Sequence, residues 1–455
     1  MPFAWLSYEA VQGPFYVIMT FALFGPFFSN EIVGDSQTGQ QYWGYYQATA
    51  GALVALISPF LGAHADAAGP RKPALGIFTG LGLLCTAAIW FAEPGVAGAV
   101  IIALVFITLA NVMMEFATCY HNALLVRVIS PVHVGAVSGA GYAVNWLAGL
   151  VLIAIWYVTV QNPGTAFIPL PDVPFAAERL WGPMILVWGL MFALPFFLVV
   201  PDQPPTGRRT GAAVLYGVRT LFGTFRSLKH YRNIAIFLAS RSIYYDGVIA
   251  TIVFSTIYAT GDRMFDWSNV QISIFTGTLL IAAIAGAFLG GLVDDLIGSR
   301  RTILLSVGVF AVCLTLLLGT TPQTLLYLPI DAGTAASSLP LVGEAMAAAG
   351  FATLPEQVFL LLGLFNGLMS GPALSSSRTM MSRIAPREHM TQFFGLLQLT
   401  GRATSFSAPL FIALLTDATD SQQWGLSVIL VYLAAGWLGM LFVREERSAP
   451  HRTPR

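Results

Sequence analysis

The stretch GAHADAAGPRK, which runs from Gly62 to Lys72, is repeated in altered form by GGLVDDLIGSRR, which runs from Gly290 to Arg301. An internal repeat of this kind is typical of membrane proteins built from two similar halves. At one offset, five positions match in chemistry: Gly62 with Gly291, Asp66 with Asp295, Gly69 with Gly298, Arg71 with Arg300, and Lys72 with Arg301. Five such matches are not expected by chance, so the sequence predicts two related halves.

The composition predicts that these halves lie in a lipid bilayer. Of the 455 residues, 56% are hydrophobic and 10% are charged, and the mean hydropathy is +0.72. A water-soluble globule cannot bury that much apolar surface, whereas about 20 apolar residues form a helix that spans the hydrocarbon core. We therefore expect an all-α integral membrane protein with twelve transmembrane helices, near residues 4–28, 42–63, 74–92, 97–127, 138–160, 182–200, 233–260, 270–293, 302–320, 357–381, 392–415 and 425–443.

The Lys and Arg residues predict which side of the membrane each loop faces, because positively charged loops stay in the cytoplasm during insertion. With twelve helices both termini share one side. That side holds Arg71, Lys72, Arg208, Arg209, Arg219, Arg226, Lys229, Arg232, Arg300, Arg301, Arg383, Arg387, Arg444 and Arg447, whereas Arg179 and Arg263 fall opposite. We expect both termini in the cytoplasm, a multi-pass protein in the bacterial cytoplasmic (inner) membrane, and no nucleic-acid partner.

The longest cytoplasmic break, Pro201 to Arg232, divides six predicted helices from six. It predicts an N-terminal six-helix bundle at 1–200, a cytoplasmic linker at 201–232, a C-terminal six-helix bundle at 233–443 and a cytoplasmic tail at 444–455. A second match supports the repeat, because Tyr8 and Glu9 in the first helix correspond to Tyr245 and Asp246 in the seventh. The carboxylate in the first helix is therefore interpreted as part of the repeat.

These features resemble the major facilitator superfamily over essentially the whole chain. The pattern Gly-x-x-x-Asp-x-x-Gly-x-Arg-Lys between the second and third helices is similar to the signature loop of that superfamily. The first-helix pattern W-x-x-Y-E, and the phrases VSGAGYAVNWLAG (137–149) and QFFGLLQLTGRATSFSAP (392–409), look like the autophagy-related vacuolar amino-acid effluxers and their bacterial relatives, which usually have Asp where Glu9 stands. The resemblance implies the major facilitator fold and secondary transport by alternating access.

The signature loop has a physical role that its residues support. Asp66 would lie near the cytoplasmic tip of a helix, where Arg71, Lys72 or the positive end of the next helix can satisfy it. Gly62 and Gly69 would permit a close crossing and a tight turn. We interpret the loop as a gate that holds in one transport state and breaks in another, with a static role in topology as the alternative. The second half supplies the matching gate residues Gly291, Asp295, Gly298, Arg300 and Arg301.

Ionisable side chains inside the predicted spans are candidates for the transport pathway. Each costs about 2.5–3.5 kcal/mol on insertion scales, so such residues face a cavity or a partner. They are Glu9, Glu115, Arg241, Asp246 and Arg402. Helical spacing also predicts two polar stripes that cannot face lipid. The stripes are Asn111, Glu115, Thr118 and Asn122 on the fourth helix, and Gln398, Arg402 and Ser405 on the eleventh.

The resemblance implies roles for these residues, because the first, fourth, seventh and tenth helices of the superfamily line a central cavity. Glu9, Glu115 and Asp246 would converge on it, with Glu115 and Asp246 binding a proton or a substrate amine and Arg241 or Arg402 binding a carboxylate. Arg241 and Asp246 lie about 140° apart around one helix, so their partners are expected on other helices. Fixed salt bridges are the alternative for the arginines. Asn111, Asn122 and Tyr245 complete the predicted pathway, and His121 is a candidate proton relay.

No nucleotide-binding loop, metalloprotease motif or nucleophile elbow stands in the sequence, so neither an enzyme nor an ATP-driven pump is predicted. No cofactor or metal is expected either. The leading prediction is a secondary active transporter of a small-molecule substrate, with amino acids or related solutes favoured and a proton or another cation as the coupling ion. The alternatives are a cation-coupled sugar or glycoside carrier and a non-transporting factor that assists assembly of other membrane proteins.

Overall fold

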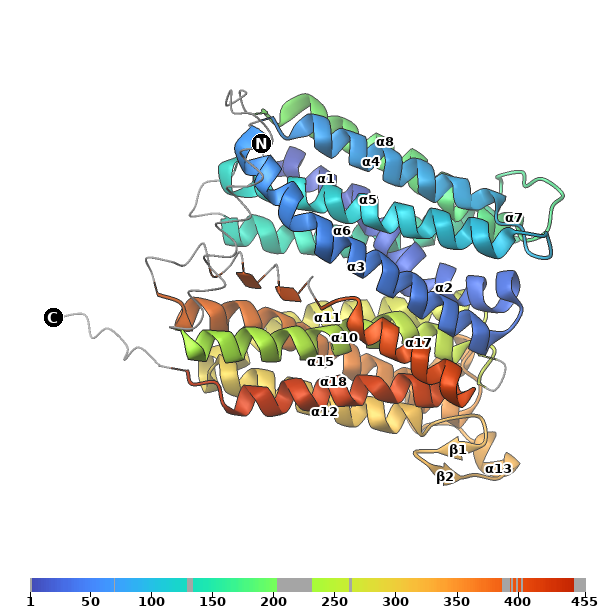
Figure 1. The fold of residues 1–455 in the computed structure, drawn as a ribbon. Helices are drawn as coiled ribbons and strands as arrows, with labels where there is room; N and C mark the ends of the chain where they lie inside the picture. The colour runs from blue at the N-terminus through green and yellow to red at the C-terminus, as the bar shows by residue number, and fades with distance from the viewer. Residues whose placement is uncertain are drawn as a thin grey trace. The chain divides into compact units, whose positions relative to one another are not determined.

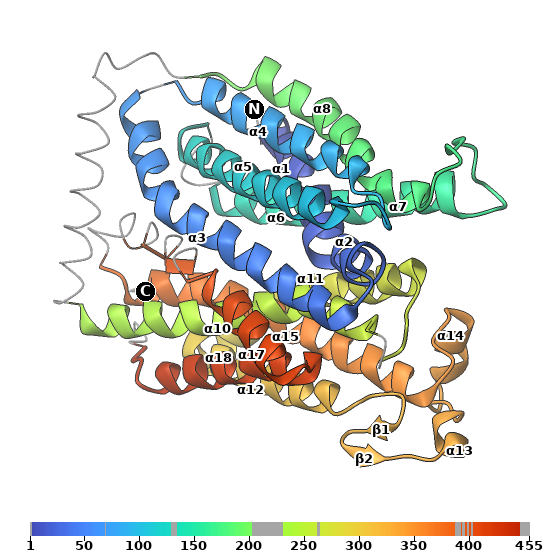
Figure 2. The ribbon, with the colours of Figure 1, turned by 45° about the vertical axis from the view of Figure 1, so that its right-hand side comes forward.

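The computed structural model describes residues 2–68, 70–128, 134–202, 231–261, 264–386 and 404–445, together with 393, 396, 397, 400 and 401. The chain forms two compact units of long helices (Figure 1, Figure 2). The first unit comprises Met1–Gly223, Ile252–Gly277 and Ser405–Leu426, and the second comprises Thr224–Thr251, Thr278–Thr404 and Ser427–Arg455.

The first unit is built mainly from helices of the first half of the chain. Its long helices are α1 (Pro2–Pro14), α3 (Ser36–Ala68), α4 (Lys72–Ala88), α5 (Ala99–Val128), α6 (Val134–Trp156) and α8 (Trp181–Val199). Shorter elements are η1 (Phe15–Ala22), α2 (Phe24–Phe27), η2 (Phe28–Val33), η3 (Ile89–Phe91), η4 (Tyr157–Gln161) and α7 (Ala176–Arg179), and α17 (Ser407–Thr419) joins them from the second half. The indole N–H of Trp188 joins two of these helices, since Nε1 on α8 donates to the Ala10 carbonyl on α1 at 2.8 Å.

The first span bends by 46° between Phe3–Ala22 and Phe24–Val33. Pro14 ends α1, and the wider π-helical turn η1 follows it without a gap. Proline has no N–H to donate to the preceding turn, so it interrupts the regular α-helical hydrogen bonds and favours such a local change. Pro26 lies in α2, just beyond the bend. The proline positions therefore change the type and direction of the helix without ending the span.

The second unit contains the first part of α10 (Arg232–Ala259), most of α11 (Asn269–Ile297), α12 (Ser299–Leu318), α15 (Leu354–Ile384) and most of α18 (Gln422–Leu441). Trp437 Nε1 on α18 donates to the Leu304 carbonyl on α12 at 2.8 Å. α15 begins with a capping box, in which the Thr353 backbone N–H donates to the Glu356 carboxylate at 2.9 Å and the Thr353 hydroxyl accepts from the Glu356 backbone N–H at 3.4 Å. Such caps satisfy the free N–H groups of a first turn.

The loop between α12 and α15 has a structure of its own. Its strands β1 (Thr324–Leu325) and β2 (Leu328–Pro329) pair antiparallel, with Thr324 opposite Pro329 and Leu325 opposite Leu328. The short helices α13 (Ala332–Ala335) and α14 (Gly343–Ala348) follow. Gln357 is fully buried at the start of α15, where it accepts from the Leu339 N–H at 2.8 Å and donates to the Phe351 carbonyl at 3.0 Å. A single buried amide therefore fastens this loop to the bundle.

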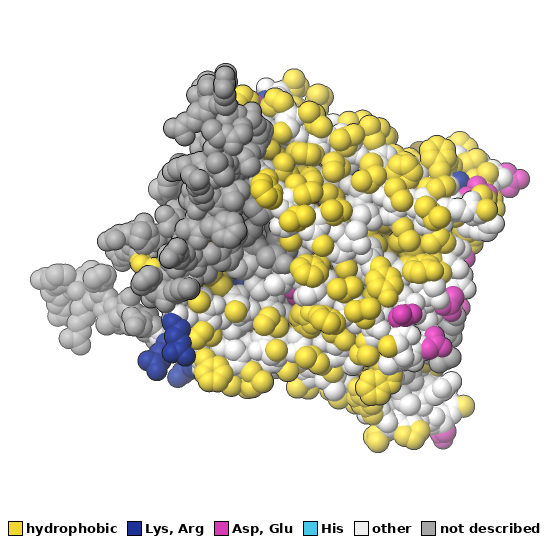
Figure 3. Space-filling view, in the orientation of Figure 1, with side chains coloured by type: hydrophobic (Ala, Val, Ile, Leu, Met, Phe, Trp, Pro, Cys, Tyr) yellow, Lys and Arg dark blue, Asp and Glu magenta, His cyan; other side chains and the backbone are white. Residues whose placement is uncertain are grey.

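The outer faces of the helices are apolar. Large hydrophobic side chains that are more than half exposed include Ile101 and Val187 in the first unit and Phe288 and Val312 in the second. Figure 3 shows hydrophobic side chains spread across the described part of the face in view. Isolated apolar residues are normal on a soluble protein, but apolar surface of this extent is expected of helices that contact lipid.

The prediction of an all-α membrane protein is confirmed. Nine helices of the described residues are long and apolar enough to cross a membrane, or ten when the bent first pair counts as one span. α3 covers the predicted span at 42–63, and α17 covers the last part of the span at 392–415, of which other residues lie outside the described part. The twelve-helix count and the two six-helix halves therefore stay predictions.

The sidedness of the loops can be tested directly. A reporter fused after Arg455, and another inserted near Gly207, should both report cytoplasm, because the positively charged loops share that side. A third reporter near Ser337, in the structured loop between α12 and α15, should report the opposite face. Alkaline phosphatase activity and fluorescent-protein emission at the three positions report the side of each. A reporter found on the face opposite to the one expected, at any of the three positions, would contradict the helix count.

Candidate functional site

The predicted polar stripe on α5 faces α1, η1 and α3. Asn111 is buried, and its side-chain amide donates to the Tyr46 hydroxyl on α3 at 2.8 Å. The Tyr16 hydroxyl on η1 donates to Glu115 at 2.9 Å. Thr118 accepts from the Gln12 side chain on α1 at 2.8 Å. The stripe therefore forms a row of polar contacts inside the first unit, where a polar solute or a proton could find hydrogen-bonding partners.

The predicted acid on α1 lies one to two turns further along the same interface. Glu9 Oε1 is 3.6 Å from Nδ1 of His121 on α5, and its side chain is 15% exposed. The Asn145 side chain on α6 hydrogen-bonds the Glu9 carboxylate and also donates to the Glu9 main-chain carbonyl at 3.2 Å. Asn122, the last stripe residue, is part of α5, but its side chain lies outside the described residues.

The second unit carries a buried base and a buried acid on α10. Arg241 is 6% exposed, donates to the Leu397 carbonyl at 2.7 Å and stacks its guanidinium 4.5 Å above the Tyr245 ring. Asp246 is 5% exposed and accepts a hydrogen bond from Thr404. Among the described residues, Arg241 Nε and Asp246 Oδ2 have no hydrogen-bond partner, and no ion pair joins the two side chains. Each side chain therefore has one polar atom that can still form a hydrogen bond with a ligand.

The three acids that are predicted to converge on one cavity lie in different units of the structure. Glu9 and Glu115 lie in the first unit and Asp246 lies in the second. Arg402 and Gln398 lie outside the described residues. A common cavity for all of these groups stays a prediction.

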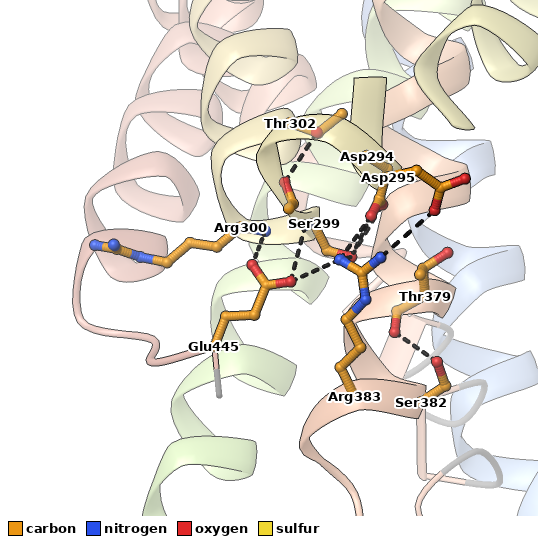
Figure 4. Close-up of polar contacts among 10 residues, drawn as sticks. Asp294, Asp295, Ser299, Arg300, Thr302, Thr379, Ser382, Arg383 and Glu445 are labelled. Carbon is orange, nitrogen blue, oxygen red and sulfur yellow. Dashed lines mark hydrogen bonds and ion pairs between the residues drawn. The ribbon is translucent and has the colours of Figure 1, made fainter. Parts of the chain in front are cut away.

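The predicted gating loop of the second half lies in a network of polar contacts around Arg383, at the end of α15 (Figure 4). Its guanidinium is 2.7 Å from Asp294, 2.7 Å from Glu445 and 3.8 Å from Asp295. Asp294 also accepts from the Ser299 hydroxyl at 2.9 Å. Glu445 accepts the backbone N–H groups of Ser299 at 3.0 Å and Arg300 at 2.9 Å, at the start of α12. The network thus joins the ends of α11, α12, α15 and α18.

The pKa of Glu445 is set by two opposing effects. Partial burial raises this pKa, but the backbone N–H of Arg300, the Arg383 guanidinium and the backbone N–H of Ser299 outweigh burial and hold it below its ordinary value. Hydrogen bonds and a nearby positive charge stabilise the ionised carboxylate in this way. Glu445 is therefore a charged cap on the first turn of α12.

In the second half, the buried contacts of this loop lie one residue before the predicted gate residues Gly291 and Asp295. Asp295 was aligned with Asp66, but its side chain is 82% exposed, whereas that of Asp294 is 4% exposed and contacts Arg383. Gly291 was expected at a close helix crossing, but space around it is open, and a Cβ on Gly290 would lie 2.2 Å from Pro372. Successive helical residues point about 100° apart, so a one-residue shift moves a side chain off the contact face.

The other predicted residues of this loop have distinct placements. Gly298 has a φ of +94° and links α11 to α12, a conformation that favours glycine. Arg300 donates to the Met440 carbonyl at 3.3 Å and to the Leu441 carbonyl at 2.7 Å, at the end of α18. Arg301 is exposed.

The predicted gating loop of the first half has a similar arrangement in its described part. The backbone N–H groups of Arg71 and Lys72, at the start of α4, donate to the Asp202 carboxylate at 2.8 and 3.1 Å. Lys72 Nζ donates to the Phe197 and Val200 carbonyls at 2.7 and 2.6 Å, at the end of α8. The Arg71 side chain is buried. Gly69 lies outside the described residues, as do the Asp66 side chain and the surroundings of Gly62.

The two loops therefore share a design that sequence comparison missed. In each loop a carboxylate just beyond the end of a helix accepts two backbone N–H groups from the start of another helix; the carboxylates are Asp202 after α8 and Glu445 after α18. A cation at the start of that other helix then donates to carbonyl groups at the end of α8 or α18; the cations are Lys72 and Arg300. Positive ends of helices attract anions and negative ends attract cations. The available signal was an acid a few residues beyond the last apolar residue of each half.

At another end of the first unit, segments of the second half bond to helices of the first half. Gln40 on α3 is fully buried and donates to Thr416 on α17 at 2.8 Å, and Gln422 donates back to the Ser36 carbonyl at 2.9 Å. Asn30 donates to the Thr260 carbonyl at 2.8 Å. Close by, a pocket of about 310 Å³ is lined by several carboxylates, those of Glu31, Glu178 and Asp266. Segments from both halves of the sequence are therefore hydrogen-bonded to one another in this part of the first unit.

Comparison with known proteins identifies the family. Residues 133–452 match the family described as "Vacuole effluxer Atg22 like". The chain belongs to the Atg22-like family. An uncharacterized MFS-type transporter of Bacillus subtilis, YxiO, is 22% identical over 98% of this chain and 95% of its own length. Autophagy-related protein 22 of Yarrowia lipolytica is 22% identical over 74% of this chain, a match that spans 55% of the fungal protein.

The fold of this Atg22-like protein is that of the major facilitator superfamily. The crystal structure of a D-xylose-proton symporter superposes with a TM-score of 0.64 and 13% identity, covering 97% of this chain and 95% of the symporter. The predicted resemblance is confirmed, and the protein is a multi-pass secondary transporter of the major facilitator type. Its relatives are transporters and not enzymes, in agreement with the sequence analysis.

Proposed function

We propose that this Atg22-like protein is a proton-coupled transporter of amino acids or chemically related small zwitterions in the bacterial cytoplasmic membrane, with both termini in the cytoplasm. The observation that carries the proposal is the pair of buried, oppositely charged side chains Arg241 and Asp246 on α10. Each retains a polar atom without a partner among the described residues. Burial of such groups is costly, so a ligand that supplies the missing partners explains why both are kept.

The chemistry of the pair favours a zwitterion over a sugar. A guanidinium presents planar N–H donors that suit a carboxylate, and a carboxylate such as Asp246 suits an ammonium group. Because no ion pair joins Arg241 to Asp246 in the described structure, each is available to an opposite charge on the substrate. A sugar offers hydroxyl groups and would leave both charges unneutralised. The family description, a vacuole effluxer, supports a solute carrier of this kind.

Alternating access would use the two gating loops and the closed end of the first unit. Asp202 and Glu445 hold helix ends together through hydrogen bonds that can break as a set. The Gln40–Thr416 and Gln422–Ser36 contacts join the halves of the sequence elsewhere. A transporter that rocks between two states needs contacts that form in one state and break in the other, and we propose that both sets of hydrogen bonds act in this way.

Uptake into proteoliposomes tests the proposal. The purified full-length protein is reconstituted, and radiolabelled uptake is measured for each of the proteinogenic L-amino acids and for D-xylose, with and without an imposed pH gradient. We expect one or more amino acids to accumulate only when the gradient is present. Accumulation of D-xylose with no amino-acid uptake would contradict the proposal and favour the sugar carrier.

A further inference from the structure

His121 has no role in the gating loops or in the polar stripe, yet its imidazole is fully buried on α5. The Trp5 ring stacks on it, with ring centroids 4.3 Å apart and an interplanar angle of 15°. Tyr8 lies 4.4 Å away on another side, and Phe196 of α8 approaches edge-on at 5.5 Å. Three aromatic rings therefore hold the imidazole in one orientation and keep water from its faces.

The hydrogen bond on one side of the ring determines the chemistry on the other side. His121 Nε2 lies 3.3 Å from the Trp5 carbonyl oxygen. A carbonyl oxygen only accepts hydrogen bonds, so Nε2 carries the hydrogen and, in the neutral ring, Nδ1 is an acceptor. Nδ1 faces Glu9 Oε1 at 3.6 Å and has no hydrogen-bond partner among the described residues. An ionised Glu9 would thus place two acceptors against each other in a buried site.

One additional proton removes this conflict. It can lie on the Glu9 carboxyl group, which then donates toward Nδ1, or on Nδ1, which leaves an imidazolium beside a carboxylate. In both forms the pair is electrically neutral. Loss of the proton leaves one uncompensated negative charge in a site of low dielectric. We propose that Glu9 and His121 together bind a single exchangeable proton and that this proton is the coupling ion of transport.

The groups that surround the pair support a proton site over a fixed salt bridge. Tyr8 contributes the only other titratable side chain in contact with the ring within the described residues, and its hydroxyl is hydrogen-bonded to Thr79 of α4. The other contacts are the Asn145 amide from α6 and the Phe196 ring from α8. No Lys or Arg of the described residues forms an ion pair with Glu9. Within the described part of the chain, therefore, no cation replaces the proton when it leaves.

The two members of the pair differ in exposure. The Glu9 side chain is 15% exposed, whereas the His121 side chain is fully buried, so the carboxyl group is the end from which a proton can leave to water. Space around the carboxyl group is otherwise tight, because a Cβ on Gly141 would lie 3.2 Å from Glu9 Cγ and 3.0 Å from the Trp5 ring. The coupling role rests on the proposed transport function, whereas proton binding by the pair does not.

Infrared difference spectroscopy of the full-length protein in phosphatidylcholine vesicles tests proton binding without any solute. Between acidic and alkaline buffer, the wild type should lose a protonated-carboxyl band that is absent from Glu9→Gln. His121→Phe keeps an aromatic ring in the stack and should shift the midpoint of that band by about one pH unit or more. Tyr8→Phe is the matched control, since it keeps the ring and removes only a hydroxyl, and its band should match the wild type. If the proton lies on Nδ1 instead, the titrating band is that of the His121 ring and is absent from His121→Phe. Absence of both a Glu9 carboxyl band and a His121 ring band, or an equal shift in Tyr8→Phe, would overturn the proton pair.

Transport then tests the coupling role separately. In proteoliposomes, with the L-amino acid mixture as the probe, Glu9→Gln should lose pH-driven accumulation to a far greater degree than it loses exchange of labelled for unlabelled amino acids. Gln can donate to Nδ1 as a protonated Glu does, so the fold should be preserved. Retained pH-driven accumulation in Glu9→Gln would overturn the coupling role. If the wild type moves no amino acid, the transport proposal fails while the infrared result still decides whether the proton site exists.

Discussion

Arg241→Gln should raise the half-saturating amino-acid concentration for uptake by about 10- to 150-fold, because a charged hydrogen bond to a substrate carboxylate contributes about 1.5–3 kcal/mol. Asp246→Asn should raise the half-saturating concentration by a similar factor for substrates with a free amine. The Asn side chain still has an oxygen that can accept the hydrogen bond from Thr404. The measurement is initial uptake against concentration in proteoliposomes that hold equal amounts of protein.

Tyr245→Phe provides the control for the Arg241 experiment. It retains the ring beneath the guanidinium, 4.5 Å from it, and removes only the hydroxyl, so its uptake should fall much less than that of Arg241→Gln. Arg241→Lys keeps the charge but loses the planar fork, so it should fall between wild type and Arg241→Gln. Wild-type uptake by a folded Arg241→Gln protein would show that Arg241 is structural and would remove the main support for a zwitterionic substrate.

Asp294→Asn should lower the free energy of unfolding by about 1.5–3 kcal/mol, the usual contribution of a hydrogen bond to a charged group. The side chain is nearly fully buried and contacts both Arg383 and Ser299. Asp295→Asn is the matched control on the next residue, and its exposed side chain, 3.8 Å from Arg383, should contribute less than about 0.5 kcal/mol. Thermal unfolding in detergent compares the two. Equal stability of the two variants would contradict the placement of Asp294 at the centre of the gate.

The same network predicts a pH dependence. Because the pKa of Glu445 is held below its ordinary value in the folded protein, its contribution to stability is present above the ordinary carboxyl pKa of about 4.3 and is lost as the pH falls through the lower, folded-state value. Glu445→Gln should reduce this acid sensitivity. An unchanged acid unfolding profile in that variant would show that the cap on α12 contributes nothing measurable.

Sequence reasoning located the membrane spans well, because about 20 consecutive apolar residues are a strong signal that depends on no other part of the chain. The predicted span at 74–92 compares with Lys72–Phe91, and that at 233–260 with Arg232–Ala259. The stripe on α5 was also readable, since side chains at helical spacing share a face whatever they contact.

Contacts between helices were harder to predict. Sequence alone could not choose between Asp294 and Asp295, because the choice depends on the rotation of α11 against α15. It missed Asp202 and Glu445, because a single acid beyond a helix has no periodic neighbours to mark it. His121 was noted beside the stripe, but its position opposite Glu9 follows from packing of Trp5 and Tyr8 around the ring.

Proton movement driven by an amino acid is the most direct test of the account. Proteoliposomes that contain the full-length protein and a trapped pH-sensitive dye are mixed with a transported L-amino acid, in the absence of any imposed pH gradient. We expect the internal pH of wild-type proteoliposomes to change as the amino acid enters. We expect Glu9→Gln proteoliposomes to take up the amino acid with no change in internal pH. Amino-acid uptake by the wild type with no change in internal pH would contradict proton-coupled transport.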